Sequence, residues 1–101
     1  MAGTVLGDFI ASLQRNDLQS YLRQGLIGEN AVIDGPCGRK SMIYADYVAS
    51  GRALAPVEDF IRDEVLPYYA NSHTEASYCG AFCTRLREDA RRQIHRIVRA
   101  D

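Results

Sequence analysis

The strongest constraint in this sequence is one long amphipathic helix pattern that fills its last quarter, residues 77–99. Apolar residues recur there every three or four positions, a spacing that places their side chains on one face of an α-helix. The pattern begins near Ser77 and runs to about Arg99, without a C-terminal glycine cap. A helix of this kind must pack its apolar face on something, so we expect it to lie against a larger body. That face comprises Phe82, Leu86, Ala90, Ile94 and Ile97.

Two short helices are predicted near the start of the chain. Residues 5–13 have helical apolar spacing and follow Thr4, a residue type favoured at the N-cap. A second helix is expected to begin near residues 16–17, and Gly25 and Gly28 offer places to end it. The apolar residues of these two helices are Val5, Leu6, Phe9, Ile10 and Leu13, then Leu18, Tyr21 and Leu22.

A third helix is predicted to begin at Pro56, because proline suits the first helical turn. Pro67 should end or kink it near Leu66. Residues 67–77 then read as an irregular polar and aromatic loop. The apolar face of this helix comprises Val57, Phe60, Ile61 and Val65.

The middle of the chain predicts a small β element. Residues 31–33 and 42–45 are β-prone, and residues 34–40 between them are rich in turn formers. This predicts a hairpin or strand entry with a turn longer than two residues. Residues 49–51, Ala-Ser-Gly, then form a stretch small enough for a ligand or another backbone to approach closely.

Composition limits the classes of protein that this chain can belong to. With 47% hydrophobic and 25% charged residues among 101, it is an ordinary globular chain, and intrinsic disorder is not expected. A net charge of −1 provides no global field for nucleic acid or an anionic membrane. No apolar run approaches the roughly 18–20 residues that span a bilayer.

Residues 1–13 lack the basic region of a signal peptide. Three cysteines without such a peptide indicate free thiols, so a cytoplasmic location is expected.

Residues 43–98 contain four recognisable parts in a fixed order. Residues 44–51 read Tyr-Ala-Asp-Tyr-Val-Ala-Ser-Gly, and a helix then begins near Pro56. The loop Asn71-Ser72-His73 follows, and the long helix carries the run 87–91, Arg-Glu-Asp-Ala-Arg. In order and spacing these parts resemble the opening of class V aminotransferases, the cysteine desulfurase-like branch of fold-type I pyridoxal-phosphate (PLP) enzymes.

The resemblance implies a fold class and a function. The chain is expected to be mainly α with a small β element, as the N-terminal fragment of an α/β fold-type I PLP-dependent transferase. It would form a single segment over 1–101, with N-terminal helices in 1–28, the β element and small-residue turn in 29–51, and two helices joined by an active-site-like loop in 52–101. The parent enzyme would bind pyridoxal 5'-phosphate, act on an amino acid and form a homodimer.

The resemblance also assigns site residues. Tyr47 and Val48 stand where the family usually has Asn-Ala, so only the small residues after them are carried over, as a wall facing substrate or cofactor. Asp46 is expected to be structural, at the end of the strand. The substrate- or cofactor-facing residues are therefore Ala49, Ser50, Gly51, Asn71 and His73.

No catalytic residue is expected in this chain. PLP enzymes need a lysine that bonds covalently to the cofactor. The one lysine here, Lys40, lies in a glycine-rich turn where it should be solvated. The family's cofactor lysine and its aspartate partner come later in the polypeptide than residue 101, so the chain should not be competent alone, and its main partner would be the rest of the parent polypeptide.

Three other features each leave two interpretations open. His73 beside Glu75 can stack on a PLP ring or shuttle a proton, or it can hydrogen-bond its own loop. Cys79 and Cys83 share a helix face, which permits metal binding, but the spacing is not a CxxC pair, and small packed thiols are expected instead. The arginine-rich face can bind nucleic acid, or it can be a solvated face with Glu88–Arg91, Glu88–Arg92 and Asp89–Arg92 pairs.

Three functions follow, in order of preference. The first is the N-terminal part of a PLP-dependent class V aminotransferase-like enzyme. The alternative is a free-standing helical protein-interaction module, favoured by the missing cofactor lysine. The third is a small basic-helix nucleic-acid binder, which lacks the interleaved aromatic residues of a stacking platform.

Overall fold

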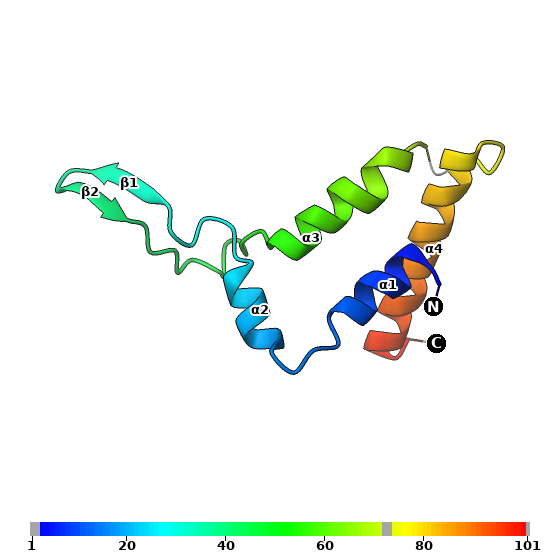
Figure 1. The fold of residues 1–101 in the computed structure, drawn as a ribbon, viewed down its shortest axis with the longest axis horizontal. Helices are drawn as coiled ribbons and strands as arrows, with labels where there is room; N and C mark the ends of the chain where they lie inside the picture. The colour runs from blue at the N-terminus through cyan, green and yellow to red at the C-terminus, as the bar shows by residue number, and fades with distance from the viewer. Residues whose placement is uncertain (1–2, 72–73, 101) are drawn as a thin grey trace. The chain divides into compact units, whose positions relative to one another are not determined.

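The computed structural model describes residues 3–71 and 74–100. Within these residues it has four α-helices and one two-stranded antiparallel sheet (Figure 1), so the expected combination of helices with a small β element is confirmed. The chain divides into two compact units. The helical unit comprises Met1–Asn16 with Asp59–Asp101, and the hairpin unit comprises Asp17–Glu58. Each is described by itself below.

The first helix of the helical unit begins where the sequence indicates. Helix α1 spans Val5–Ser12, and the Thr4 hydroxyl accepts a hydrogen bond from the Gly7 backbone N–H at 2.9 Å. This side-chain cap satisfies one of the donors that a helix N-terminus leaves without an intrahelical partner. The prediction of a helix over residues 5–13 with Thr4 as its N-cap is confirmed.

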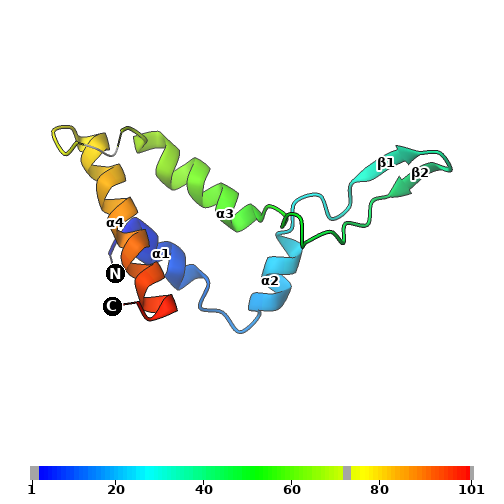
Figure 2. The same cartoon turned by 180° about the vertical axis from the view of Figure 1, so that it is seen from behind.

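The long helix is confirmed as well. Helix α4 spans Tyr78–Val98, and its N-cap Ser77 accepts a hydrogen bond from the Gly80 N–H. At the other end Arg99 takes the left-handed conformation (φ 56°) and donates its N–H to the Arg96 carbonyl at 3.3 Å. An arginine thus occupies the position that glycine usually fills at a helix end. Helix α1 packs along α4, as Figure 2 shows from behind.

The predicted third helix is irregular beyond its first turns. Helix α3 spans Ala55–Phe60, with Pro56 in its first turn as expected. It continues as a π-helical turn, η1 (Ile61–Val65), and a 3-10 turn, η2 (Leu66–Tyr68). The Leu66 N–H bonds to the Ile61 carbonyl, five residues back. Because Pro67 has no N–H to donate, the π-helical turn cannot continue through it, and the segment changes to a 3-10 turn at Leu66, where the sequence predicts an end or kink.

The core of the helical unit is small. Among the described residues, the buried apolar side chains are Phe82 (9% exposed) and Cys83 (8% exposed). The Phe82 ring packs on that of Tyr68 with centroids 5.1 Å apart, and Phe9 packs on Phe60 at 4.5 Å. These aromatic contacts tie η2 to α4 and α1 to the end of α3.

The hairpin unit contains helix α2 and a close backbone crossing. Helix α2 spans Leu18–Gln24 between Asp17 and Gly25, as the sequence predicts. The Gly25 carbonyl accepts a hydrogen bond from the Ala55 N–H at 2.7 Å, within the same unit. A Cβ at Gly25 would lie 2.8 Å from Cδ of Pro56, so this crossing requires glycine.

The β element is a hairpin, but its second strand was predicted in the wrong place. Strand β1 (Val32–Gly35) pairs with β2 (Gly38–Ser41), and the connecting loop is the two residues 36–37. The predicted strand at 42–45 and the longer turn are therefore wrong. Gly38 has φ +99°, which lets the chain reverse within two residues. All strand residues are exposed, so burial does not select β-prone side chains here, and composition misplaced the second strand.

Every helix in the described parts of the chain is too short or too polar to cross a membrane.

Replacing Phe82 with alanine should lower the thermal stability of the helical unit. The truncation removes about 3 kcal/mol, which is comparable to what a core this small can supply. Far-UV circular dichroism during a thermal melt measures the effect. Ile97→Ala is the matched control, because Ile97 lies on the same helix and is 76% exposed. Equal melting of the two variants would show that Phe82 is not the core.

Candidate functional site

The predicted small-residue wall lies in an exposed turn of the hairpin unit. Ala49, Ser50 and Gly51 are all exposed. The backbone N–H groups of Ala49 and Ser50 both bond to the Asp46 carbonyl, at 3.1 and 3.2 Å. Asp46 therefore shapes the turn through its backbone, but the strand whose end it was expected to mark is not formed by residues 42–45.

A tyrosine fixes this turn from one side. The Tyr44 hydroxyl lies 2.6 Å from the Ser50 carbonyl oxygen and 3.0 Å from that of Asp46, and donates toward both. Because one hydroxyl carries one proton, the two carbonyls share it. The Tyr44 side chain thus bridges the two ends of the turn and limits how far residues 46–50 can open.

Arg52 connects the turn to the segment after α2. Its guanidinium carbon lies 4.6 Å from the centroid of the Tyr44 ring, and its Nη2 donates to the Ile27 carbonyl at 3.0 Å. Gly28, which follows Ile27, has φ +94°, a backbone conformation that favours glycine. Sequence reasoning missed Tyr44 and Arg52 as positioning residues, because a bond from Arg52 to Ile27 spans 25 positions and leaves no periodic signal.

The second predicted element of the site is the loop before α4 in the helical unit. Asn71 is described and exposed, and Glu75 is exposed as well. His73 lies outside the described residues, and so does Ser72. The His73–Glu75 pair therefore stays a prediction.

Cys83 holds the start of this loop. Its sulfur accepts a hydrogen bond from the Ala70 N–H at 3.3 Å and donates to the Tyr68 carbonyl at 3.7 Å. The predicted role of a small packed thiol is confirmed for Cys83, and the thiol also anchors the backbone just before Asn71. Nothing in the sequence marks this function, since it depends on η2 lying against α4.

Gly80 brings the far end of the loop close to α4. It is buried, and a Cβ there would lie 2.7 Å from the Thr74 carbonyl oxygen. Only glycine lets residue 74 approach the first turn of α4 so closely.

An open hollow of about 570 Å³ lies beside Asn71 in the helical unit. Its walls are mostly apolar and come from η1, the start of the loop and one face of α4. Arg87 contributes the positive charge and Asn71 an amide. The lining residues are Val65, Tyr69, Ala70, Asn71, Cys83, Leu86, Arg87 and Ala90.

The structure thus splits the predicted site residues into two groups. Ala49, Ser50 and Gly51 belong to the hairpin unit, and Asn71 belongs to the helical unit.

Lys40 does not fit the role of a cofactor lysine. It lies on the exposed strand β2, directly across from Ile33 of β1. A lysine that attaches a cofactor needs a partly enclosed, desolvated environment that lowers its affinity for protons. An exposed two-stranded ribbon provides no such environment for Lys40 within the described residues.

The cysteines of this chain and the arginines of α4 have contacts that fit structural roles. Cys37, Cys79 and Cys83 are free thiols. Within 3–71 and 74–100, no group of three or more His, Cys, Asp and Glu side chains could hold a metal ion. Asp89 pairs with Arg92 in the predicted i,i+3 manner, and Arg87 lies 3.7 Å from Glu88. These pairs support the interpretation of a solvated charged face.

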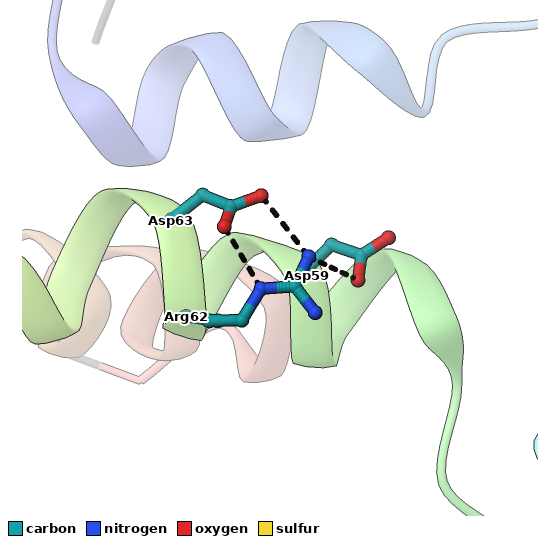
Figure 3. Close-up of polar contacts among 3 residues, drawn as sticks. All are labelled: Asp59, Arg62 and Asp63. Carbon is teal, nitrogen blue, oxygen red and sulfur yellow. Dashed lines mark hydrogen bonds and ion pairs between the residues drawn. The ribbon is translucent and has the colours of Figure 1, made fainter.

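A small cluster of ion pairs lies on the surface of the α3–η1 segment (Figure 3). Arg62 donates from Nε to Asp63 at 2.9 Å and from Nη2 to Asp59 at 3.1 Å. The hydrogen bond from Arg62 lowers the pKa of Asp63 below its usual value of 3.8, and the positive charge acts in the same direction. Both partners are exposed, so this cluster is a surface feature.

Comparison with protein-family models, with curated proteins and with solved structures finds no match to this chain.

Removing the Tyr44 hydroxyl should loosen the small-residue turn. In Tyr44→Phe the Ser50 carbonyl loses its donor, which is worth about 1 kcal/mol. The amide protons of Ala49 and Ser50 should then exchange roughly fivefold faster by NMR. Tyr47→Phe is the control, because that ring only packs edge-on against Tyr44, with centroids 5.3 Å apart. Unchanged exchange in Tyr44→Phe would mean that the hydroxyl does not hold the turn.

The Arg62–Asp63 pair gives a pH prediction. A depressed carboxylate pKa contributes stability above the unfolded pKa, and this contribution is lost as pH falls through the folded pKa. An NMR titration should place the Asp63 midpoint below 3.8, and Arg62→Gln should raise it toward that value. Arg39→Gln, which alters an exposed arginine paired with Asp34, should leave the Asp63 midpoint unchanged.

Proposed function

We propose that this chain is the N-terminal part of a PLP-dependent class V aminotransferase-like enzyme that acts on an amino acid. The observation that carries the proposal is the order of four parts over residues 43–98: the Tyr-Ala-Asp run ending in small residues, the helix from Pro56, the Asn71 loop and the Arg-rich helix. Each part alone is a weak signal, and their joint order is far more specific. The parent would be a cytoplasmic homodimer.

The local structure of these parts suits the roles proposed for them. The Ala49–Gly51 turn is exposed and tied down by Tyr44, so it can present backbone and small side chains to a ligand without rearranging. The Asn71 loop is anchored at its start by Cys83, and Asn71 and residues 74–77 are exposed. A substrate-facing wall needs fixed backbone with open space in front of it.

The chain's role in the reaction is to bind and orient, without a catalytic group of its own. PLP, when bound in the parent, supplies an electron sink for the carbanion formed beside the substrate nitrogen. Ala49, Ser50 and Gly51 let the substrate approach the backbone closely, Asn71 offers an amide for a hydrogen bond, and His73 remains a proposed active-site residue. Because Lys40 does not fit as the attachment site, the cofactor lysine belongs to another part of the parent.

The exposed apolar surface supports the proposal that more polypeptide covers this chain. Val48 and Ile43 are 101% and 91% exposed, and Ile97 is 76% exposed. Isolated soluble chains rarely leave so many large apolar side chains in water. The same observation fits the alternative, a free-standing interaction module whose partner covers these faces.

One experiment on the native gene product distinguishes the enzyme from the interaction module. It is purified intact from its own cells, its mass is measured, and it is treated with borohydride to trap covalently bound PLP. A mass several-fold above 11.3 kDa with a PLP-modified lysine outside this segment supports the enzyme. A mass near 11.3 kDa with no PLP adduct leaves the interaction module.

The isolated chain of 101 residues should expose apolar surface in solution. We expect it to bind an apolar fluorescent dye and to self-associate with rising concentration, because its exposed aliphatic faces gain free energy by burial. Dye fluorescence and analytical ultracentrifugation check this. A concentration-independent monomer with sharp two-state unfolding and no dye binding would contradict it.

A further inference from the structure

The outer edge of strand β1 is open. Strands β1 and β2 form a two-stranded sheet, and no third strand joins them in the described residues (Figure 1). Val32 and Ile33 of β1 are 50% and 49% exposed. A two-stranded hairpin is at best marginally stable in water, and an open strand edge is a template for pairing with another chain. The register of the hairpin shows which backbone groups this edge presents.

The hydrogen-bonding pattern determines which groups of β1 point away from β2. The Met42 N–H donates to the Ala31 carbonyl at 2.8 Å, so these two residues form a hydrogen-bonded pair. Such pairs alternate with non-hydrogen-bonded pairs along an antiparallel ladder. Ile33 therefore bonds inward to β2, while the N–H and C=O groups of Val32 and Asp34 point outward. No hydrogen bond within residues 3–71 and 74–100 occupies these outward groups.

The open groups are arranged symmetrically about Ile33. Val32 precedes it and Asp34 follows it, and each offers one donor and one acceptor. A second copy of β1 can run antiparallel along this edge with its Ile33 opposite the first. Val32 of each copy then pairs with Asp34 of the other, and all four outward N–H groups meet a carbonyl. The edge is therefore complementary to itself through a two-fold axis.

The side chains of β1 suit this register. The two Ile33 residues would form a non-hydrogen-bonded pair, in which side chains lie closest and β-branched residues pack well. The Asp34 carboxylate lies 3.4 Å from the Arg39 Nε of its own hairpin. This ion pair offsets the negative charge that each copy would bring to the contact.

The outer edge of β2 does not offer the same fit. Its outward-facing residues are Arg39 and Ser41, which lie directly across from Asp34 and Val32. The equivalent two-fold pairing of β2 would place Lys40 opposite its own copy, and directly opposed like charges destabilise a sheet. Cationic side chains also protect a strand edge from further pairing. A sheet joined through β1 would have β2 at both outer edges and would stop at two copies.

We propose that two copies of this chain associate through β1, in an antiparallel pair centred on Ile33 that extends the hairpin to a four-stranded sheet. Each copy contributes one strand of four residues, so the contact is small and the dimer is weak and reversible. The resemblance to an enzyme family implies a homodimer without naming its interface. The β1 contact rests on the hairpin unit alone and not on the proposed function.

NMR on the full chain of 101 residues locates the contact. In a mixture of isotope-labelled and unlabelled chains, an isotope-filtered experiment should detect a nuclear Overhauser effect between the Ile33 side chains of two copies. The amide protons of Val32 and Asp34 should exchange more slowly as the protein concentration rises, because they become hydrogen-bonded. Association of the chain without contact between the two Ile33 side chains would contradict the proposed register.

Proline variants distinguish the two edges of the hairpin. Val32→Pro removes an outward N–H and keeps the ladder to β2, because that N–H takes no part in it. Two of the four intermolecular hydrogen bonds are lost, so analytical ultracentrifugation should show association weakened at least about tenfold. Ser41→Pro makes the same change directly across the ladder and is the matched control, with unchanged association expected. Slow exchange of the Met42 amide verifies the hairpin in both variants.

A charged residue at the two-fold axis gives an independent test. Ile33→Glu would place two carboxylates opposite each other and should abolish the dimer. Ile43→Glu is the control, because Ile43 lies outside the strands of the same unit and is 91% exposed. Equal losses in the two glutamate variants would mean that any burial of apolar surface drives association.

Four outcomes would overturn the proposal. They are a chain that stays monomeric, growth beyond two copies, unchanged association in Val32→Pro, and equal effects of the two proline variants. None of these measurements involves PLP, so the β1 contact and the enzyme proposal can fail independently.

Discussion

The packing of Phe82 is the interaction on which the helical unit depends. Its ring and the adjacent Cys83 are the buried apolar side chains of the described residues, and Tyr68 covers the ring from η2. Burying one phenylalanine stabilises a fold by a few kcal/mol, which a large core supplies many times over and this unit does not. The remaining aliphatic residues of α4 and η1 stay partly in water.

Cys83, the residue after Phe82, connects the core to the loop of the proposed site. Cys83 is buried beside Phe82, and its thiol bonds to the backbone of Tyr68 and Ala70. The same helix turn that forms the core therefore fixes the loop that leads to Asn71. The equivalent role in the hairpin unit belongs to Tyr44, whose hydroxyl closes the small-residue turn. In both places a side chain outside the proposed substrate-facing set determines where that set can lie.

An incomplete core and an incomplete site have one explanation under the proposed function. Lys40 lies on an exposed ribbon, and apolar faces such as that of Ile97 are open. A polypeptide that supplies the cofactor lysine would also supply the surface that covers those faces.

The sequence by itself determined the helices and their ends. Thr4, Ser77 and Gly25 mark helix boundaries, and Pro67 marks the change of helix type, because capping and proline sterics act over a few neighbouring residues. It misplaced strand β2, because an exposed ribbon is not selected for β-prone side chains. Only the tertiary structure decided that Cys83 anchors the loop, that Arg52 reaches Ile27 and that Val65 joins α4 in a groove. Each of these contacts joins residues far apart in the chain, and periodicity in the sequence carries no information about such pairs.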